Sequence, residues 1–109
     1  MSELGTKRKL FTALLPKLIN KMMDAGFSPM IGKDGEKHMK NSLHFEGLAQ
    51  DFVLTKDGQI FDKTEDHAPF GIYWENLHPD CCWGGRFDAA EGRFGNDGGH
   101  YSVKFGGRK

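Results

Sequence analysis

Two short stretches of the chain bring histidine and carboxylate side chains close together, as a metal site would require. In the first, His44 and Asp51 are seven residues apart, with Gly47 between them. On an unbroken strand this odd spacing would put the two side chains on opposite faces, but a turn at Gly47 would let them converge. In the second, Asp97 precedes His100 by three residues, at the start of an expected strand.

Two imidazole nitrogens and one carboxylate oxygen form a ligand set that suits Zn²⁺ and leaves a fourth position for water. A further carboxylate that does not bind the metal could then accept a proton from that water. The residue types alone also fit a surface hydrogen bond between histidine and aspartate. Spacing by itself does not separate these two interpretations.

The elements expected to position these residues begin with an amphipathic helix over residues 10–23. Its apolar side chains recur every four residues in two rows, which form one broad face with lysines off it. Pro16 is expected to kink this helix, and Gly26 is expected to end it. A weak strand over residues 27–31, interrupted by Pro29, is expected to follow.

Residues 48–61 are expected to form a β-hairpin, because Asp57-Gly58 suits a type I′ turn between two strands. Apolar side chains at helical spacing predict a second helix over residues 64–77, which begins near Asp66 or Pro69. His67 and His78 flank this helix and are expected to make hydrogen bonds.

The last third of the chain is expected to contain one irregular segment and one strand. Residues 84–99 are rich in glycine, and residues 100–105 alternate between apolar and polar side chains as a strand does. The order of elements predicts an α+β fold: a small single domain over residues 1–109 with helices packed on an antiparallel sheet. A metal site would then lie in a surface groove.

Length and composition exclude several classes of protein. A chain of 109 residues, 38% of them hydrophobic, suffices for one domain with a core. No run approaches the roughly eighteen apolar residues of a membrane span, and no secretory signal is recognisable, so we expect synthesis and folding in a cytosol. The formal net charge of zero removes a general electrostatic argument for nucleic acid as a partner.

Two adjacent cysteines offer a second, weaker candidate for metal binding. Cys81 and Cys82 cannot close a useful disulfide loop with each other, and reduced thiols fit a cytosolic origin. With His78 and Asp80 they could in principle hold a metal ion. They lack the two-residue gap of ordinary zinc sites, so buried thiols are the preferred interpretation.

A longer pattern favours the metal interpretation of the histidines. The string S-x-H-x-x-G-x-A-x-D over residues 42–51 resembles the first zinc motif of the D-Ala-D-Ala carboxypeptidase family. That family includes vancomycin-resistance dipeptidases and phage L-alanyl-D-glutamate endolysins. Its second motif, an acidic residue followed three positions later by histidine and an aromatic residue, resembles Asp97, His100 and Tyr101. The resemblance spans residues 10–105 and includes Tyr73-Trp74-Glu75 and Trp83-Gly84-Gly85.

The resemblance implies a role for each matching residue. His44, Asp51 and His100 would hold one zinc ion per chain. Asp97 would be the general base and then the general acid, and Ser42 would line the site and contact substrate. The implied activity is hydrolysis of the peptide stem of bacterial peptidoglycan, with the L-Ala-D-Glu bond favoured over D-Ala-D-Ala.

One departure from the family leaves substrate recognition open. Members of the family commonly have an arginine before the first motif that binds a substrate carboxylate, whereas residues 27–41 contain only lysines, at positions 33, 37 and 40. Arg86 could supply this role, since a guanidinium forms two parallel bonds to a carboxylate and an ammonium does not. A plain surface cation is the alternative for Arg86. Trp83 could be either a core residue or a wall of the substrate groove.

The preferred interpretation is therefore a small zinc peptidase of the phage endolysin type, monomeric and without membrane insertion. It would accumulate in the host bacterial cytoplasm and act on the cell wall after release. An alternative is a catalytically inactive, zinc-stabilised structural or wall-binding module, against which Asp97 argues. A small DNA-binding protein is disfavoured by the zero net charge and the lack of a recognition motif.

Overall fold

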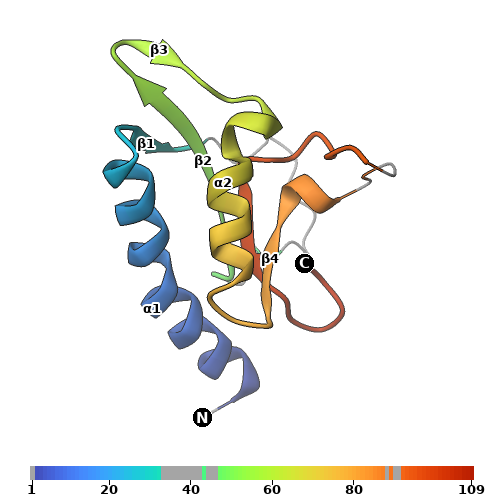
Figure 1. The fold of residues 1–109 in the computed structure, drawn as a ribbon. Coiled ribbons are helices and arrows are strands. Elements are labelled where there is room, and N and C mark those ends of the chain that lie inside the picture. The colour runs from blue at the N-terminus through green and yellow to red at the C-terminus, as the bar shows by residue number, and fades with distance from the viewer. Residues whose placement is uncertain (1, 33–42, 44–46, 88, 90–91) are drawn as a thin grey trace.

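A computed structural model describes residues 2–32, 43, 47–87, 89 and 92–109. Two helices and a five-stranded sheet make up this part of the chain (Figure 1). In chain order the elements are α1 (Glu3–Asp24), β1 (Ser28–Ile31), β2 (Ala49–Lys56), β3 (Gln59–Ile60), α2 (Thr64–Glu75), β4 (Cys81–Trp83), a 3₁₀ turn (Gly84–Arg86) and β5 (His100–Val103). The predicted α+β class is confirmed.

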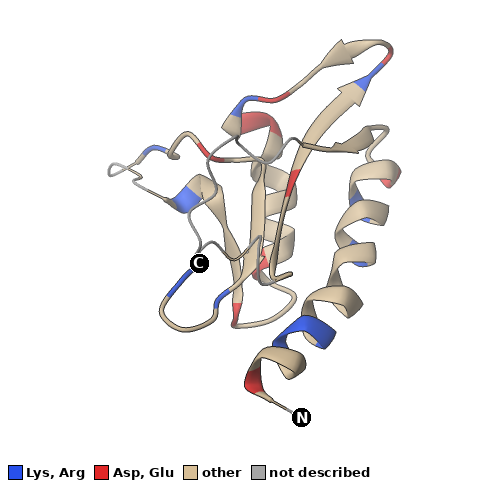
Figure 2. Ribbon diagram, turned by 180° about the vertical axis from the view of Figure 1, so that it is seen from behind, with Lys and Arg blue, Asp and Glu red and all other residues tan. Residues whose placement is uncertain are grey.

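The sheet is antiparallel throughout, with strand order β1-β2-β5-β4 and β3 paired to the far end of β2. Both helices pack against the same face of this sheet, α1 beside β1 and β5, and α2 over β4 (Figure 1). Basic side chains lie along α1 and in the C-terminal segment, whereas acidic ones mark the start of α2 (Figure 2). The opposite face of β2 and β5 carries the residues of interest.

Helix α1 begins earlier than its apolar pattern predicts. The Ser2 hydroxyl accepts a hydrogen bond from the Gly5 amide and caps the helix, so the structure extends back to Glu3. The helix runs through Pro16, which is exposed. Gly26 ends it as predicted: its φ of +94° allows the Gly26 and Phe27 amides to bond the carbonyls of the last turn, which is a Schellman motif.

The predicted hairpin is confirmed. Asp57 and Gly58 have φ angles of +51° and +77°, the pair of positive values that a type I′ turn needs. The second helix is also confirmed, although it begins at Thr64, before both predicted starts. The Asp66 carboxylate accepts a hydrogen bond from the Lys63 amide and fixes this earlier start.

Strand β5 departs from the expected alternation between a buried and a solvated face. All four of its residues are buried, including His100 at 7% and Ser102 at 0% exposure. β5 lies between β2 and β4, which cover its two edges. On one of its faces Tyr101 packs against Trp74 of α2, and on the other His100 packs against the Phe87 ring.

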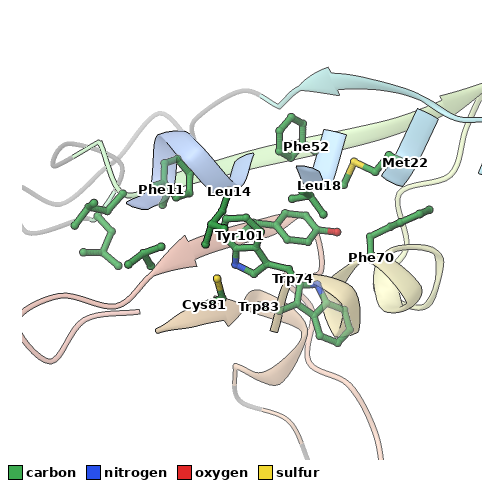
Figure 3. Packing of buried hydrophobic residues seen from close by; sticks show 14 of the residues in the cluster. Phe11, Leu14, Leu18, Met22, Phe52, Phe70, Trp74, Cys81, Trp83 and Tyr101 are labelled. Carbon is green, nitrogen blue, oxygen red and sulfur yellow. The ribbon is translucent and has the colours of Figure 1, made fainter. Parts of the chain in front are cut away.

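The core lies between the helices and the sheet and is built around aromatic rings. Phe11 of α1 meets Trp74 of α2 edge to face at 5.8 Å, and Trp74 meets Tyr101 of β5 at 6.2 Å (Figure 3). Leu14, Leu18 and Met22 continue the buried stripe along α1 (Figure 3). This core fixes β5, and with it His100, relative to both helices.

Candidate functional site

Asp51 and His100, one from each sequence motif, lie directly opposite each other across β2 and β5. Asp51 Oδ1 is 3.1 Å from His100 Nδ1. The Asp51 side chain is 25% exposed and that of His100 9% exposed, so the pair lies at the boundary between core and solvent. The antiparallel register therefore brings together two of the three predicted ligands, which are far apart in sequence.

The distance between these two atoms fits a shared ion. Two ligands that each lie about 2.0–2.2 Å from a tetrahedral zinc ion are roughly 3.4 Å apart. The distance also fits a direct hydrogen bond between imidazole and carboxylate. The third predicted ligand, His44, and the predicted substrate contact Ser42 lie outside the described residues, as do the three lysines at positions 33, 37 and 40. Within the described ranges, no three His, Cys, Asp or Glu side chains cluster as a metal site.

Asp97 lies close to this pair. The carbonyl of Asp97 accepts a hydrogen bond from the His100 amide at 3.1 Å, which closes a tight turn ahead of β5. Asp97 and Asp51 both line a groove of about 200 Å³, together with Asp62, Asn96 and the backbone around Gly98. The predicted general base thus borders the same groove as a predicted ligand.

Glycine at position 84 is what allows this turn to approach the end of β4. A Cβ atom on Gly84 would lie 2.0 Å from the Asp97 carbonyl oxygen and 2.7 Å from His100 Cβ, both far inside contact distance. Gly85 is required for another reason, because its Cβ would meet the Trp83 ring at 2.3 Å. Both glycines that follow Trp83 are therefore needed for close packing: Gly84 against the turn from Asp97 to His100, and Gly85 against the Trp83 ring.

Trp83 belongs to the core. It is fully buried, as a core residue is, and its possible role as a groove wall in contact with substrate stays a prediction. Its indole N–H instead donates to the Gly98 carbonyl at 2.7 Å. Trp83 thus holds the backbone between Asp97 and His100 in place.

Arg86 already holds a carboxylate. Its Nε and Nη2 donate to the two carboxylate oxygens of Glu75, each at 3.0 Å, and its guanidinium lies 5.5 Å from the Trp83 and Phe94 ring centres. These bonds raise the pKa of Arg86 above its usual value. A substrate carboxylate would have to displace Glu75 or use the remaining edge of the guanidinium, so the predicted role of Arg86 stays a prediction.

Next to the groove, His67, Tyr101 and Asp62 form a hydrogen-bonded network. The sequence analysis predicted hydrogen bonds for His67 but not these partners. The His67 ring is fully buried; Nδ1 lies 2.8 Å from the Tyr101 hydroxyl and Nε2 lies 2.9 Å from Asp62 Oδ1. Burial, with Asp62 nearby, raises the pKa of Tyr101 and keeps its phenol neutral. Asp62 and Tyr101 are far apart in sequence, so residue spacing could not predict this network.

The two cysteines are both free thiols and differ in burial. Cys81 is buried and points to the core side of β4, while Cys82 is half-buried on the other face. Burial, followed by the neighbouring Cys82, raises the pKa of the Cys81 thiol to about 12. The preferred interpretation of buried thiols is confirmed for Cys81.

Comparisons of the chain with protein-family models, with curated proteins and with solved structures found no match. Among the described residues, no helix is both long and apolar enough to cross a membrane. The geometry of Asp51, Asp97 and His100 is therefore the basis for the functional argument that follows.

Proposed function

We propose that the protein is a zinc-dependent peptidase that hydrolyses the peptide stem of bacterial peptidoglycan. The observation behind this proposal is the approach of Asp51 to His100, 3.1 Å apart, with Asp97 bordering the same groove. These three residues come from the two sequence motifs that resemble the carboxypeptidase and endolysin family. His44 would complete the ligand set.

The chemistry of His100 and its neighbours supports a cation at this position. Both ring nitrogens of His100 face oxygens that accept hydrogen bonds: Asp51 Oδ1 at 3.1 Å and the main-chain oxygen of Lys109 at 3.2 Å. A neutral imidazole has one N–H and can satisfy only one of them. A ring that carries a metal ion on one nitrogen and a proton on the other would suit both neighbours, and this supports the proposed ligand role of His100.

In the proposed reaction each residue has a distinct task. Zinc held by His44, Asp51 and His100 would polarise the scissile carbonyl and make a water molecule acidic. The Asp97 carboxylate takes a proton from this water as its oxygen adds to the carbonyl carbon. When the carbon–nitrogen bond breaks, Asp97 passes the same proton to the leaving amine, so that it starts each turnover ionised.

The L-Ala-D-Glu bond is the favoured target and D-Ala-D-Ala is the alternative, as the family resemblance implies. The protein would be made in the host cytoplasm and would reach the wall after release. The alternative is a catalytically inactive, zinc-stabilised module of the same fold. Such a module would need the metal ligands but no general base, so the presence of Asp97 favours the peptidase.

Digestion of purified cell wall tests the proposal. The wild-type chain is expected to release stem peptides, to lose this activity with a chelator, and to regain it when Zn²⁺ is added back. His100→Ala is the matched negative variant, and mass analysis of the products identifies the bond cleaved. Absence of cleavage by zinc-loaded, folded protein would contradict the peptidase, and metal content then shows whether an inactive zinc module remains.

A further inference from the structure

Cationic residues from both ends of the chain meet at a pocket of about 290 Å³ between the start of α1 and the segment after β5. Of the described residues that line this pocket, two are acidic, Glu3 and Asp80. Four are cationic: Lys7, Lys104, Arg108 and Lys109. The chain as a whole has a formal net charge of zero, so the excess of positive charge is local to this pocket.

The Asp80 carboxylate in this pocket is already paired. Lys7 Nζ donates to Asp80 Oδ2, and this bond is the main reason that the pKa of Asp80 lies below its usual value. The charge of Lys104 acts in the same direction. The main-chain oxygen of Lys109 is engaged as well, since it lies 3.2 Å from His100 Nε2. The positive charge left at the pocket therefore comes from the segment after β5.

A two-glycine turn adds backbone donors to the pocket wall. Gly106 and Gly107 have φ angles of +58° and +76°, and the Phe105 and Arg108 backbones exchange two hydrogen bonds of 3.0 Å across the turn. Within the described part of the chain, the amides of the two glycines themselves donate no hydrogen bond. Successive amides in a turn conformation form a concavity that binds anions.

The Arg108 side chain is folded back over this turn. A Cβ atom on Gly106 would lie 3.7 Å from Arg108 Nη2 and 3.8 Å from its Nε. The Arg108 guanidinium also lies 5.7 Å from the centre of the Phe105 ring. A guanidinium binds a phosphate group through two parallel hydrogen bonds. Amide and guanidinium donors are thus brought together on one short segment.

We propose that this pocket binds a phosphate group through the Gly106 and Gly107 amides and the Arg108 guanidinium, with Lys104 supplying further positive charge. Inorganic phosphate and a phosphodiester of an anionic wall polymer share this chemistry. The pocket offers room for one such group, and the zero net charge of the chain gives no general attraction for a polyanion. The inference goes beyond the proposed function and does not depend on it.

Titration of the full chain with inorganic phosphate, followed in ¹H–¹⁵N NMR spectra, tests the site. The Gly106 and Gly107 amide signals are expected to move downfield and to saturate, because each amide proton gains an anionic acceptor. Sodium chloride at the same ionic strength is the control and is expected to leave both signals in place. Unmoved signals in excess phosphate, or equal movement with chloride, would overturn the inference.

A pair of arginine variants separates the pocket from the general effect of charge. Arg108→Ala is expected to weaken phosphate binding about tenfold or more, since a charge-assisted bond is lost. Arg93→Ala removes the same charge from an exposed position that does not line this pocket, and it is expected to bind phosphate like wild type. Equal weakening in the two variants would overturn the inference, because loss of overall positive charge would then explain the effect.

A soluble poly(glycerol phosphate) chain, used in place of inorganic phosphate, identifies the source of the group. Movement of the same two amide signals at a lower phosphate concentration than the free ion needs would support the phosphodiester of a polymer. Movement with inorganic phosphate alone would support the free ion as the ligand. Neither measurement uses zinc or cell-wall cleavage, so failure of the proposed function and failure of this inference are distinguishable.

Discussion

The Trp83 indole N–H donates to the Gly98 carbonyl oxygen at 2.7 Å, and this bond joins the end of β4 to the turn that leads into His100. Trp74 provides a matched bond elsewhere in the core: it is equally buried, and its indole N–H donates to the Ser102 carbonyl at 3.0 Å. The two tryptophans therefore allow the effect of the turn to be separated from the effect of core packing.

Trp83→Phe and Trp74→Phe are both expected to lower the free energy of unfolding, by about 1–3 kcal/mol for the unsatisfied buried carbonyl plus a cost for lost packing. Only Trp83→Phe is expected to lower cleavage further at a temperature where both variants stay folded, because only it releases the backbone beside Asp97. Denaturant unfolding and wall digestion measure the two effects. Equal activity of the two variants would contradict a role for Trp83 in holding the turn.

Asp97→Asn is expected to reduce cleavage by about 10²–10⁴-fold and to leave zinc content near wild type. The amide keeps the shape of the side chain but has no lone pair basic enough to take a proton. Asp62→Asn is the control, since Asp62 lines the same groove but bonds to His67. Loss of zinc from Asp97→Asn, or full activity, would contradict the assigned role.

Arg86→Lys is expected to lower kcat/KM on a defined muropeptide, because an ammonium keeps the charge but loses the paired geometry toward a carboxylate. Its effect on stability should be small, about 0–1 kcal/mol, since the Arg86 side chain is 51% exposed and its pair with Glu75 is screened by solvent. Unchanged kinetics in both Arg86→Lys and Arg86→Ala would remove Arg86 from substrate binding. Alanine variants of Lys33, Lys37 and Lys40 test the competing cations.

The Cys81 thiol is expected to react slowly with alkylating reagents at neutral pH, because its pKa of about 12 leaves almost no thiolate. A thiol whose pKa is raised on folding stabilises the fold below the unfolded pKa, about 8.5, and this contribution is lost as the pH rises toward 12. Unfolding of wild type and Cys81→Ala between about pH 7 and 10 measures it. Alkylation of Cys81 in the folded chain at neutral pH, as fast as that of a free thiol, would contradict the burial.

Much of the fold follows from patterns that are local in the sequence. The period of the apolar residues predicted both helices, and Asp57-Gly58 predicted the β2–β3 turn, because helix periodicity and turn geometry depend on neighbours a few residues away. The start of α1 was missed because it depends on a cap at Ser2 rather than on apolar periodicity. Strand β4 was missed because three residues are too few to show alternation.

The sequence by itself determined the residue types of the candidate site and the two motifs that contain them. Only the tertiary structure decided that Asp51 faces His100 and that Trp83 is buried in the core. It also decided that the Arg86 guanidinium is paired with Glu75 and that Lys109 contacts His100 Nε2. Asp51 and His100 are 49 positions apart in the sequence, and the other contacts join residues of different structural elements. Such contacts depend on strand register and on packing around a shared core, and no pattern of neighbouring residues specifies either one.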